Sequence, residues 1–292
     1  MIVITGITGH SGRYFYQELI KNNYQDEINF LVRADSDTSF IKPQPNFHII
    51  HVDLNHFEKF AAILQGADTI FHIAGIHYTL NIVKHAIKYN CRRFIVVHTT
   101  GIYSNYKKAA SEYIRIDEAL AQYKNQIRIT ILRPTMIYGN LCDHNMSQFI
   151  KMVDKLKLYP NIAYGHCLIQ PVHAADLGKA YYQVLINPST ENKAYNLSGE
   201  RPIQLIECLK IIQAELNSKN LFIPIPLWLA TISAKCLKVI SLGSIDLIEK
   251  VQRMGENRAY DHQSATNDFN YQPRSFDVGI HQEIIEYKEM GK

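Results

Sequence analysis

The sequence has few cysteines, and none of them stands in an arrangement that builds a disulfide framework or a metal site. The five are scattered, odd in number and never form a Cys-x-x-Cys pair: Cys91, Cys142, Cys167, Cys208 and Cys236. This usage argues against a disulfide scaffold and against a zinc centre, so we expect no metal site. Free cysteines are typical of a reducing compartment, which favours a cytoplasmic protein.

The sequence also lacks any long run of one charge. Lys and Arg number 31 against 27 Asp and Glu, a formal net charge of +4. Nucleic-acid binding proteins concentrate basic residues in a patch or stripe, so we expect no nucleic-acid partner. No repeat or low-complexity linker is present either.

Long apolar runs are nearly absent. The chain does not begin with a charged segment followed by an apolar stretch, so we expect no signal peptide. Residues 221–242 are apolar, but Pro224, Pro226, Lys235 and Lys238 interrupt them. Their composition favours an amphipathic helix of a small C-terminal domain over a membrane contact, and no membrane span is expected.

The first 14 residues, in contrast, carry a dense signal and read MIVITGITGHSGRY. Residues 2–4 are apolar and β-branched, as in a strand buried on both faces. Gly6, Gly9 and Gly12 follow at intervals of three, and a helical pattern runs over residues 11–21. A glycine turn between a strand and a helix presents backbone N–H groups and the positive helix end to a pyrophosphate. The pattern predicts a dinucleotide site.

Strands and helices then alternate. Strands are expected at 28–32, 47–52, 69–73, 93–98 and 127–132, and helices at 56–65, 78–89 and 106–123. This alternation predicts an α/β fold, a Rossmann-type doubly wound parallel sheet. With 292 residues and 47% hydrophobic content, the chain can form one large α/β domain and a smaller appendage.

The second half predicts a smaller, mostly helical substrate domain. Strands are expected near 168–173 and 195–197, and helices at 145–158, 174–186, 203–216, 227–240, 245–253 and 276–287. We assign residues 1–140, joined by return segments at about 166–200, to the dinucleotide-binding domain. Residues 141–165 and 201–292 then form the substrate domain, and the two domains share a cleft.

Arg33 follows the second expected strand, where the adenosine ribose of a dinucleotide would lie. An arginine there can pair with a 2′-phosphate, whereas an acid would bind a 2′-hydroxyl. NADP is therefore favoured as the cofactor. Asp35 and Asp37 could serve a hydroxyl instead, which leaves NAD open.

Several further motifs occur in the order found in one family. The chain resembles the extended and atypical short-chain dehydrogenase/reductases and looks like an NAD(P)-dependent epimerase/dehydratase, similar to the nucleotide-sugar epimerases, over nearly its whole length. The motifs are Thr5-Gly6-x-x-Gly9-x-x-Gly12, Asp53-Leu54, Ala74-Gly75, Thr99-Thr100-Gly101-Ile102-Tyr103, Leu132-Arg133-Pro134 with Tyr138-Gly139, Pro171-Val172-His173-x-x-Asp176, and Tyr195-Asn196-Leu197-Ser198-Gly199.

The resemblance implies a set of cofactor contacts. Asp53 would meet the adenine amino group with Leu54 packed beside it, although Asp53 could equally be a helix N-terminal acid. Pro134 would lie at the nicotinamide end. The complete expected set is Gly6, Thr8, Gly9, His10, Ser11, Gly12, Arg33, Asp53, Leu54, Ala74, Gly75 and Pro134.

The family's chemistry needs a hydroxyl side chain, a tyrosine and a lysine four residues after the tyrosine. Thr99 stands at the hydroxyl position, with Thr100 as the alternate, and Tyr113 stands at the tyrosine position. The lysine position holds Asp117, and an anion one turn away raises the pKa of a phenol instead of lowering it. The usual proton relay is thus altered, with Thr99, Tyr113 and Asp117 as the candidate catalytic residues.

Other residues could replace the missing cation or base. We interpret the Tyr-x-x-x-Lys spacing of Tyr103 and Lys107 as coincidental, although Lys107 or Lys108 could fold over the cofactor. The segment after Gly75 is short, which brings His77 and Tyr78 toward the nicotinamide and makes His77 a candidate acid or base. This shortening is similar to the atypical members, some of which bind cofactor without redox chemistry.

The sequence therefore supports an NADP-dependent epimerase, dehydratase or reductase acting on a nucleotide-sugar or another small carbonyl or hydroxyl substrate. The alternative is a non-catalytic NADP-binding sensor or assembly factor, which Asp117 favours, and a third reading is an apo scaffold. Arg253 and Arg258 are candidates for a substrate diphosphate or are surface cations. A homodimer through residues 78–89 and 106–123 stays open, and the substrate is not specified.

Overall fold

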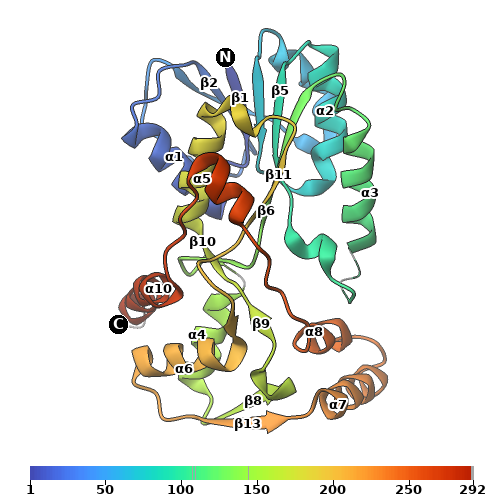
Figure 1. The fold of residues 1–292 in the computed structure, drawn as a ribbon, viewed down its shortest axis with the longest axis vertical. Coiled ribbons are helices and arrows are strands. Elements are labelled where there is room, and N and C mark those ends of the chain that lie inside the picture. Colours follow the sequence, from blue (N-terminus) through green and yellow to red (C-terminus); the bar gives the residue numbers. More distant parts are fainter. Residues whose placement is uncertain (107, 109, 144, 291–292) are drawn as a thin grey trace.

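The computed structural model describes residues 1–106, 108, 110–143 and 145–290 of the chain. Its centre is a parallel sheet of seven strands in the spatial order β11-β6-β5-β4-β1-β2-β3 (Figure 1). The strands are β1 (Ile2–Thr5), β2 (Ile28–Val32), β3 (Phe47–His51), β4 (Thr69–His72), β5 (Arg93–Val97), β6 (Arg128–Pro134) and β11 (Ala194–Leu197). The doubly wound sheet predicted from the alternation is confirmed.

The chain begins in the middle of this sheet and reverses direction across it. It runs outward from β1 to β3, then returns to β4 on the other side of β1 and continues outward to β11. β1 pairs in parallel with both β2 and β4. The connections that leave the carboxyl ends of β1 and β4 therefore run in opposite directions, and this switch point is where such sheets bind ligands.

Helices cover both faces of the sheet. α1 (His10–Lys21) and α5 (Ala174–Ile186) pack together on one face, and α2 (Thr79–Lys88) and α3 (Ala110–Ala121) lie on the other. The side chains of β1 alternate between the two cores: Ile2 and Ile4 join one, and Val3 joins the other. This explains why the strand is apolar at every position.

A second body lies beyond the carboxyl ends of the strands (Figure 1). Its apolar core lies largely among α4 (Met146–Lys155), α6 (Leu205–Leu216) and α10 (Phe276–Met290). Short strand pairs join it to the sheet domain: β7 (Ile137–Tyr138) with β10 (Val172–His173), and β9 (Leu168–Ile169) with β12 (Ile203–Gln204). At its far end are β8 (Leu158–Ile162), β13 (Leu221–Ile225) and α7 (Leu227–Ile240), and α8 (Ile248–Arg253) lies nearer the sheet domain.

The structure differs from the expected elements in several places. Residues 56–65 form two 3-10 helices, η1 (Leu54–Lys59) and η2 (Ala61–Leu64), instead of one α-helix. The sequence did not predict β8 and β13, which contain Pro160 and Pro224. The two pair only with each other, and a strand with one free edge tolerates proline.

The C-terminal part of the chain is divided between the two bodies. α9 (Gln263–Phe269), which the sequence did not predict, packs against β11 and α5. Ala265, Phe269 and Tyr271 are buried in the core on the α1 face of the sheet. This stretch, assigned from the sequence to the substrate domain, therefore lies with the sheet. Helices long and apolar enough to cross a membrane are not found in the described part of the chain.

Candidate functional site

Two cavities lie near the carboxyl ends of the sheet strands. The first, of about 260 Å³, is at the switch point and is called the cofactor cavity below. Among its lining residues are seven of the expected cofactor contacts: Gly6, Thr8, Arg33, Asp53, Leu54, Ala74 and Gly75. Segments from β1, β2, β3 and β4 thus converge as the sequence motifs required.

The glycine loop has the geometry that the first 14 residues predicted. Gly6 has a φ of +79°, and a Cβ atom there would lie 2.6 Å from the backbone nitrogen of Ala74. A Cβ at Gly12 would lie 2.2 Å from the carbonyl oxygen of Gly6. Only glycine fits either position, so the turn is tight and α1 packs directly upon it. Within the described residues, no side chain caps the first turn of α1.

Two side chains lie in the part of the cofactor cavity where the sequence analysis places the adenosine of a dinucleotide. Arg33 is exposed, and its one ion pair among the described residues is a loose pair with Asp35, at 3.5 Å between Nε and Oδ1. Asp53 accepts hydrogen bonds from the Asn55 amide (2.9 Å) and pairs with the His56 ring (2.9 Å). His56 and the Asn55 amide hold the pKa of Asp53 below its usual range. Asp53 therefore both caps η1 and lines the cavity, so its two readings are compatible.

Of the other expected cofactor contacts, Ser11, Gly12 and Pro134 are packed inside the fold. Ser11 is buried and lies 3.4 Å from the Tyr181 hydroxyl, and the Pro134 carbonyl accepts a hydrogen bond from Thr100 (3.2 Å). Gly9 is exposed at the start of α1, and His10 is half-buried beside Tyr14. At these positions the conformation of the loop between β1 and α1 is set by close backbone contacts and by burial of the surrounding residues.

The second cavity, of about 320 Å³, opens between the two bodies and is called the substrate cavity below. Thr99 and Thr100 line it from the end of β5, and Arg253 and Arg258 line it from the opposite side. The Thr99 hydroxyl accepts the Gly101 N–H (3.0 Å), which fixes its rotamer. Thr99 can still donate its own proton to a group in the cavity.

The two arginines reach the cavity by different routes. Arg253 ends α8, whereas Arg258 lies on an extended segment whose amide donates to the Leu168 carbonyl (2.7 Å). The Nε atoms of both are buried without a hydrogen-bond partner in the described part of the chain. Burial lowers the pKa of Arg258. Two cations with unused donors face one cavity, an arrangement that suits an anionic group.

Asp117, at the family's lysine position, has both carboxylate oxygens engaged. Oδ1 is hydrogen-bonded to Nδ1 of His98, and Oδ2 accepts from Arg133 at 2.5 and 3.1 Å. Nε2 of His98 is hydrogen-bonded in turn to Thr79 (3.1 Å). Burial opposes ionisation of Asp117, but His98 and Arg133 outweigh it and lower its pKa. The carboxylate ties α3 to β5 and β6.

The other candidate catalytic residues named from the sequence lie on α3 and in the turns that pack beside it. Tyr113 is half-buried on α3, which packs beside the turn that carries Thr100. Lys108 pairs with Asp246 (3.3 Å) and so points to the second body, and Lys107 lies outside the described residues. His77 is exposed and packs on Tyr78, with 4.0 Å between ring centroids. The Tyr103 hydroxyl donates a hydrogen bond to Oδ1 of Asn196 (3.2 Å).

Sequence reasoning missed one functional position. Gln170 is buried in the lining of the substrate cavity, donates to the Gly199 carbonyl (2.8 Å) and accepts from the Tyr260 amide (3.0 Å). It thereby holds the segment that carries Arg258. A signal was present, since Gln170 immediately precedes the Pro171 motif. Its role depends on contacts with residues 29 and 90 positions away.

Clusters of His, Cys, Asp or Glu that could hold a metal ion were not found among the described residues.

Comparison with known proteins gives this geometry its context. Residues 6–145 match a family model described as NAD(P)H-binding. The fold is that of a dTDP-glucose 4,6-dehydratase from Streptomyces venezuelae with NAD bound, at a TM-score of 0.75 and 17% identity, over 99% of this chain and 97% of that one. Residues 6–145 of this chain are thus similar to NAD(P)H-binding domains, and the whole chain has the fold of that dehydratase.

A second solved structure has the same fold as this chain. The UDP-glucuronic acid 4-epimerase from Bacillus cereus, in complex with UDP-glucuronic acid and NAD, has a TM-score of 0.75 and 16% identity. The alignment covers 99% of both chains. At this identity the likeness establishes the shared fold.

The curated relatives that the chain matches include both a subunit of a larger complex and a reductase. NADH dehydrogenase (ubiquinone) 1 alpha subcomplex subunit 9 of Dictyostelium discoideum is 23% identical over 237 residues, which cover 76% of this chain and 66% of that one. Vestitone reductase of Medicago sativa is 33% identical over 81 residues, 25% of this chain and 24% of that one. The chain thus spans less than two thirds of the length of either.

Proposed function

We propose that this protein is an NADP-dependent epimerase, dehydratase or reductase that acts on a small hydroxyl or carbonyl substrate bearing an anionic group. One observation carries the proposal: Thr99, at the end of a sheet strand, and the half-buried Arg253 and Arg258 line one cavity. The cofactor cavity lies along the same edge of the sheet. A nucleotide-sugar is the substrate class that combines a sugar hydroxyl with a diphosphate.

The residues of the cofactor cavity fit a dinucleotide. The tight turn at Gly6 and Gly12 leaves the first turn of α1 for a pyrophosphate, as the glycine spacing requires. Arg33 has a free guanidinium edge for a 2′-phosphate, because its pair with Asp35 is long and exposed. The bound nicotinamide would supply the hydride acceptor or donor.

The chain's own residues would then orient the substrate and move a proton. Arg253 and Arg258 would hold the anionic group, and the Thr99 hydroxyl would donate to the reacting oxygen. Tyr113 is our candidate proton donor. Asp117 is already bound by Arg133 and His98, so we assign it the positioning of α3 against the sheet and no proton transfer.

A second candidate function is a non-catalytic NADP-binding subunit or assembly factor. The engagement of Asp117 with Arg133 favours it, because that position then supplies no cation for the ribose and no charge that lowers the Tyr113 pKa. Two relatives are named as mitochondrial NADH dehydrogenase subunits, including the 40 kDa subunit of Neurospora crassa, at 22% identity over 245 residues. A protein of this kind would bind the dinucleotide without turning it over.

Titration of NADPH and NADH into the wild type and Arg33→Asp tests the cofactor assignment. We expect the wild type to prefer NADPH and the variant to lose about tenfold to a hundredfold in NADPH affinity, the value of a charge-assisted contact. Equal binding of NADPH by both proteins would contradict the role of Arg33. Transfer of labelled hydride from NADPH to nucleotide-sugars then separates the enzyme from the non-catalytic subunit.

A further inference from the structure

The far end of the second body carries large apolar side chains on its outside. Trp228, Leu229, Ile232, Val239 and Ile240 of α7 are all exposed, with Trp228 at 65% and Ile240 at 79%. We call these five residues the outer stripe. Their spacing of three, four and seven residues places them along one side of the helix. Leu242, just beyond the helix, is 94% exposed.

The orientation of α7 is the reverse of what burial of apolar surface alone would give. Its inward side consists of small residues, since Ala230 and Ala234 are the buried positions and pack near Val251. Lys238 also lies off the outer stripe and pairs with Asp246 at 2.9 Å. The helix therefore presents its bulky apolar side outward, and such contiguous patches mark binding surfaces.

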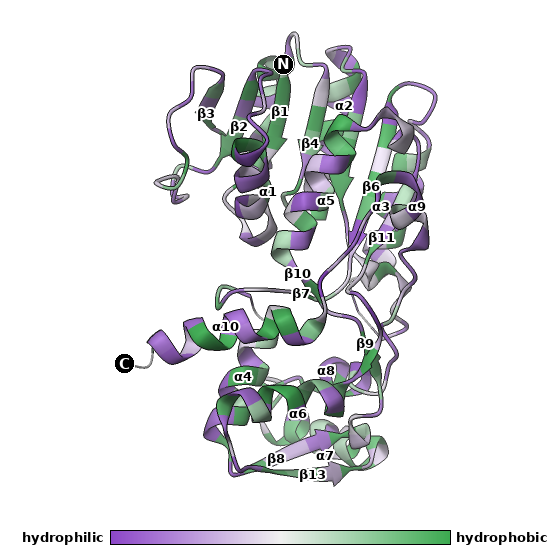
Figure 2. Cartoon of the chain, turned by 60° about the vertical axis from the view of Figure 1, so that its left-hand side comes forward, coloured by the Kyte–Doolittle hydropathy of each residue, from purple (hydrophilic) through white to green (hydrophobic). Residues whose placement is uncertain are grey.

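The strands beside α7 continue this surface. β8 and β13 pair with Leu158 opposite Leu221, and both leucines and Ile223 are exposed. Figures 1 and 2 show β8, β13 and α7 together at the end of the molecule farthest from the sheet domain. An apolar surface thus covers more than one element at this end.

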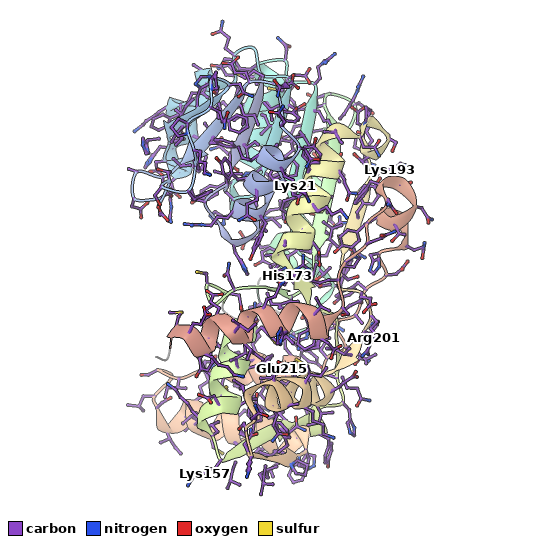
Figure 3. All side chains as sticks on the ribbon, turned by 90° about the vertical axis from the view of Figure 1, so that its left-hand side faces the viewer. Lys21, Lys157, His173, Lys193, Arg201 and Glu215 are labelled. Atoms are coloured by element: carbon purple, nitrogen blue, oxygen red, sulfur yellow. The ribbon has the colours of Figure 1, made fainter. Side chains whose placement is uncertain are left out.

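The two segments that form the surface carry basic side chains and no acidic ones. The segments that form it, residues 155–174 and 217–243, contain no Asp or Glu. Lys155, Lys157, Lys219 and Lys235 are exposed and have no ion pair within the described residues. Figure 3 shows Lys157 at this end of the molecule, away from the sheet domain.

We infer that this end of the protein docks on an anionic lipid bilayer, with α7 lying in the plane of the interface. A tryptophan and aliphatic residues on one face, with lysines beside them, are the features of interfacial helices. Exposed lysines add attraction to acidic headgroups. A second copy is a poor occupant, because a symmetric contact would set lysines against lysines, and neither of the two segments that form the surface holds an acid to pair them.

The position of Trp228 makes the inference directly measurable. It is the only tryptophan in the chain, so its fluorescence reports on α7 alone. Full-length protein is mixed with vesicles of phosphatidylcholine, with and without phosphatidylglycerol, and bound protein is collected by sedimentation. We expect binding to the anionic vesicles with a blue shift of Trp228 emission, and weaker binding at high salt.

Two charge-matched double variants separate this surface from general effects. Ile232→Asp with Ile240→Asp places two acids in the outer stripe, and Ile114→Asp with Val278→Asp places two on exposed apolar positions of α3 and α10. We expect the first to weaken vesicle binding by tenfold or more for each residue, about the value of burying one isoleucine. The second should bind as the wild type does.

Lysine variants test the electrostatic part. Lys157→Gln and Lys235→Gln should each reduce affinity for phosphatidylglycerol vesicles by about fivefold. The inference is overturned if the wild type neither sediments with anionic vesicles nor shifts its emission, or if both Asp double variants bind equally well. It is also overturned if Trp228 emission shifts with protein concentration without vesicles, since that outcome identifies a second copy as the occupant.

Discussion

At the scale of single residues, Asp117 shows how one substitution changes the meaning of a position. A lysine there would serve a cofactor ribose in the family that the chain resembles. Here the side chain is mostly buried and carries the only negative charge that the structure shows against Arg133 and His98 within the described residues. A partly desolvated arginine needs that carboxylate, because an unpaired buried charge is costly.

Restoring the family lysine by Asp117→Lys should therefore destabilise the protein instead of activating it. The new cation would face Arg133, and the loss should be about 3–5 kcal/mol, as for a broken buried ion pair. Urea denaturation followed by circular dichroism measures it. Asp117→Asn, which keeps the shape and one acceptor, should lose less; a lysine variant as stable as the wild type would refute the structural role.

Glu283 gives a pH-dependent prediction. Its side chain is fully buried, accepts a hydrogen bond from the Gly139 amide (2.9 Å) and is also hydrogen-bonded to Asp143. Burial is the main cause that raises the pKa of Glu283 to about 10, and Asp143 is the second. In the unfolded chain a glutamate ionises near pH 4.3. Between these values the folded state holds the extra proton, so this group lowers stability as pH rises.

Glu283→Gln removes that titration but keeps an acceptor for the Gly139 amide. The stability of the variant relative to the wild type should therefore increase with pH between about 5 and 9, by at most about 1.4 kcal/mol per unit. Thermal or urea unfolding at a series of pH values measures the difference. A constant difference across this range would show that Glu283 ionises normally in the fold.

At the scale of elements, the loop between β1 and α1 depends on the closeness of two backbones. A Cβ at Gly12 would lie 2.2 Å from Gly6 O, whereas one at Gly9 would lie 3.2 Å from the same atom. The first contact forces α1 away from the loop. The second needs a shift of only a few tenths of an ångström.

Gly12→Ala should accordingly abolish measurable NADPH binding and lower the melting temperature by several degrees, as expected for a loss of a few kcal/mol. Gly9→Ala serves as the comparison and should keep most of the wild-type stability. Calorimetric titration and thermal unfolding check both. If the two variants behave alike, close packing of α1 on the loop is not what the glycine at position 12 provides.

At the scale of the whole molecule, the two bodies are held together across the substrate cavity. Glu256 accepts from the Ser104 hydroxyl (2.7 Å) and the Asn105 amide (2.8 Å), which follow the turn after Thr99. Lys108 pairs with Asp246 in the same region. The relative position of Thr99 and the two arginines thus depends on this clasp.

Glu256→Ala should loosen the clasp without unfolding either core. Hydrogen exchange at the Asn105 amide should speed up by about tenfold to a hundredfold, the value of a hydrogen bond to a charged group. Glu249→Ala on α8 is the control and should leave it unchanged. Unaltered exchange in the Glu256 variant would place the interdomain contact elsewhere.

Much of the fold and of the cofactor cavity could be predicted from the sequence, because local signals encode them. The apolar run of β1, the glycine spacing and the periodicity of each strand and helix can each be recognised within a short stretch of sequence. Arg33 and Asp53 are found in the same way, because they stand just after strands. The 3-10 helices, β8 and β13 were missed, since their pairing partners or packing lie far along the chain. The role of Tyr113 as proton donor stays a proposal.

By itself the sequence determined that this chain forms a doubly wound sheet with a dinucleotide turn, because periodicity and glycine spacing act locally. Tertiary structure alone decided that Asp117 meets Arg133 and His98 and that Gln170 holds the Arg258 segment. It also decided which side of α7 faces outward. These outcomes depend on contacts between distant segments, which the packing of two separate bodies creates and no local pattern encodes.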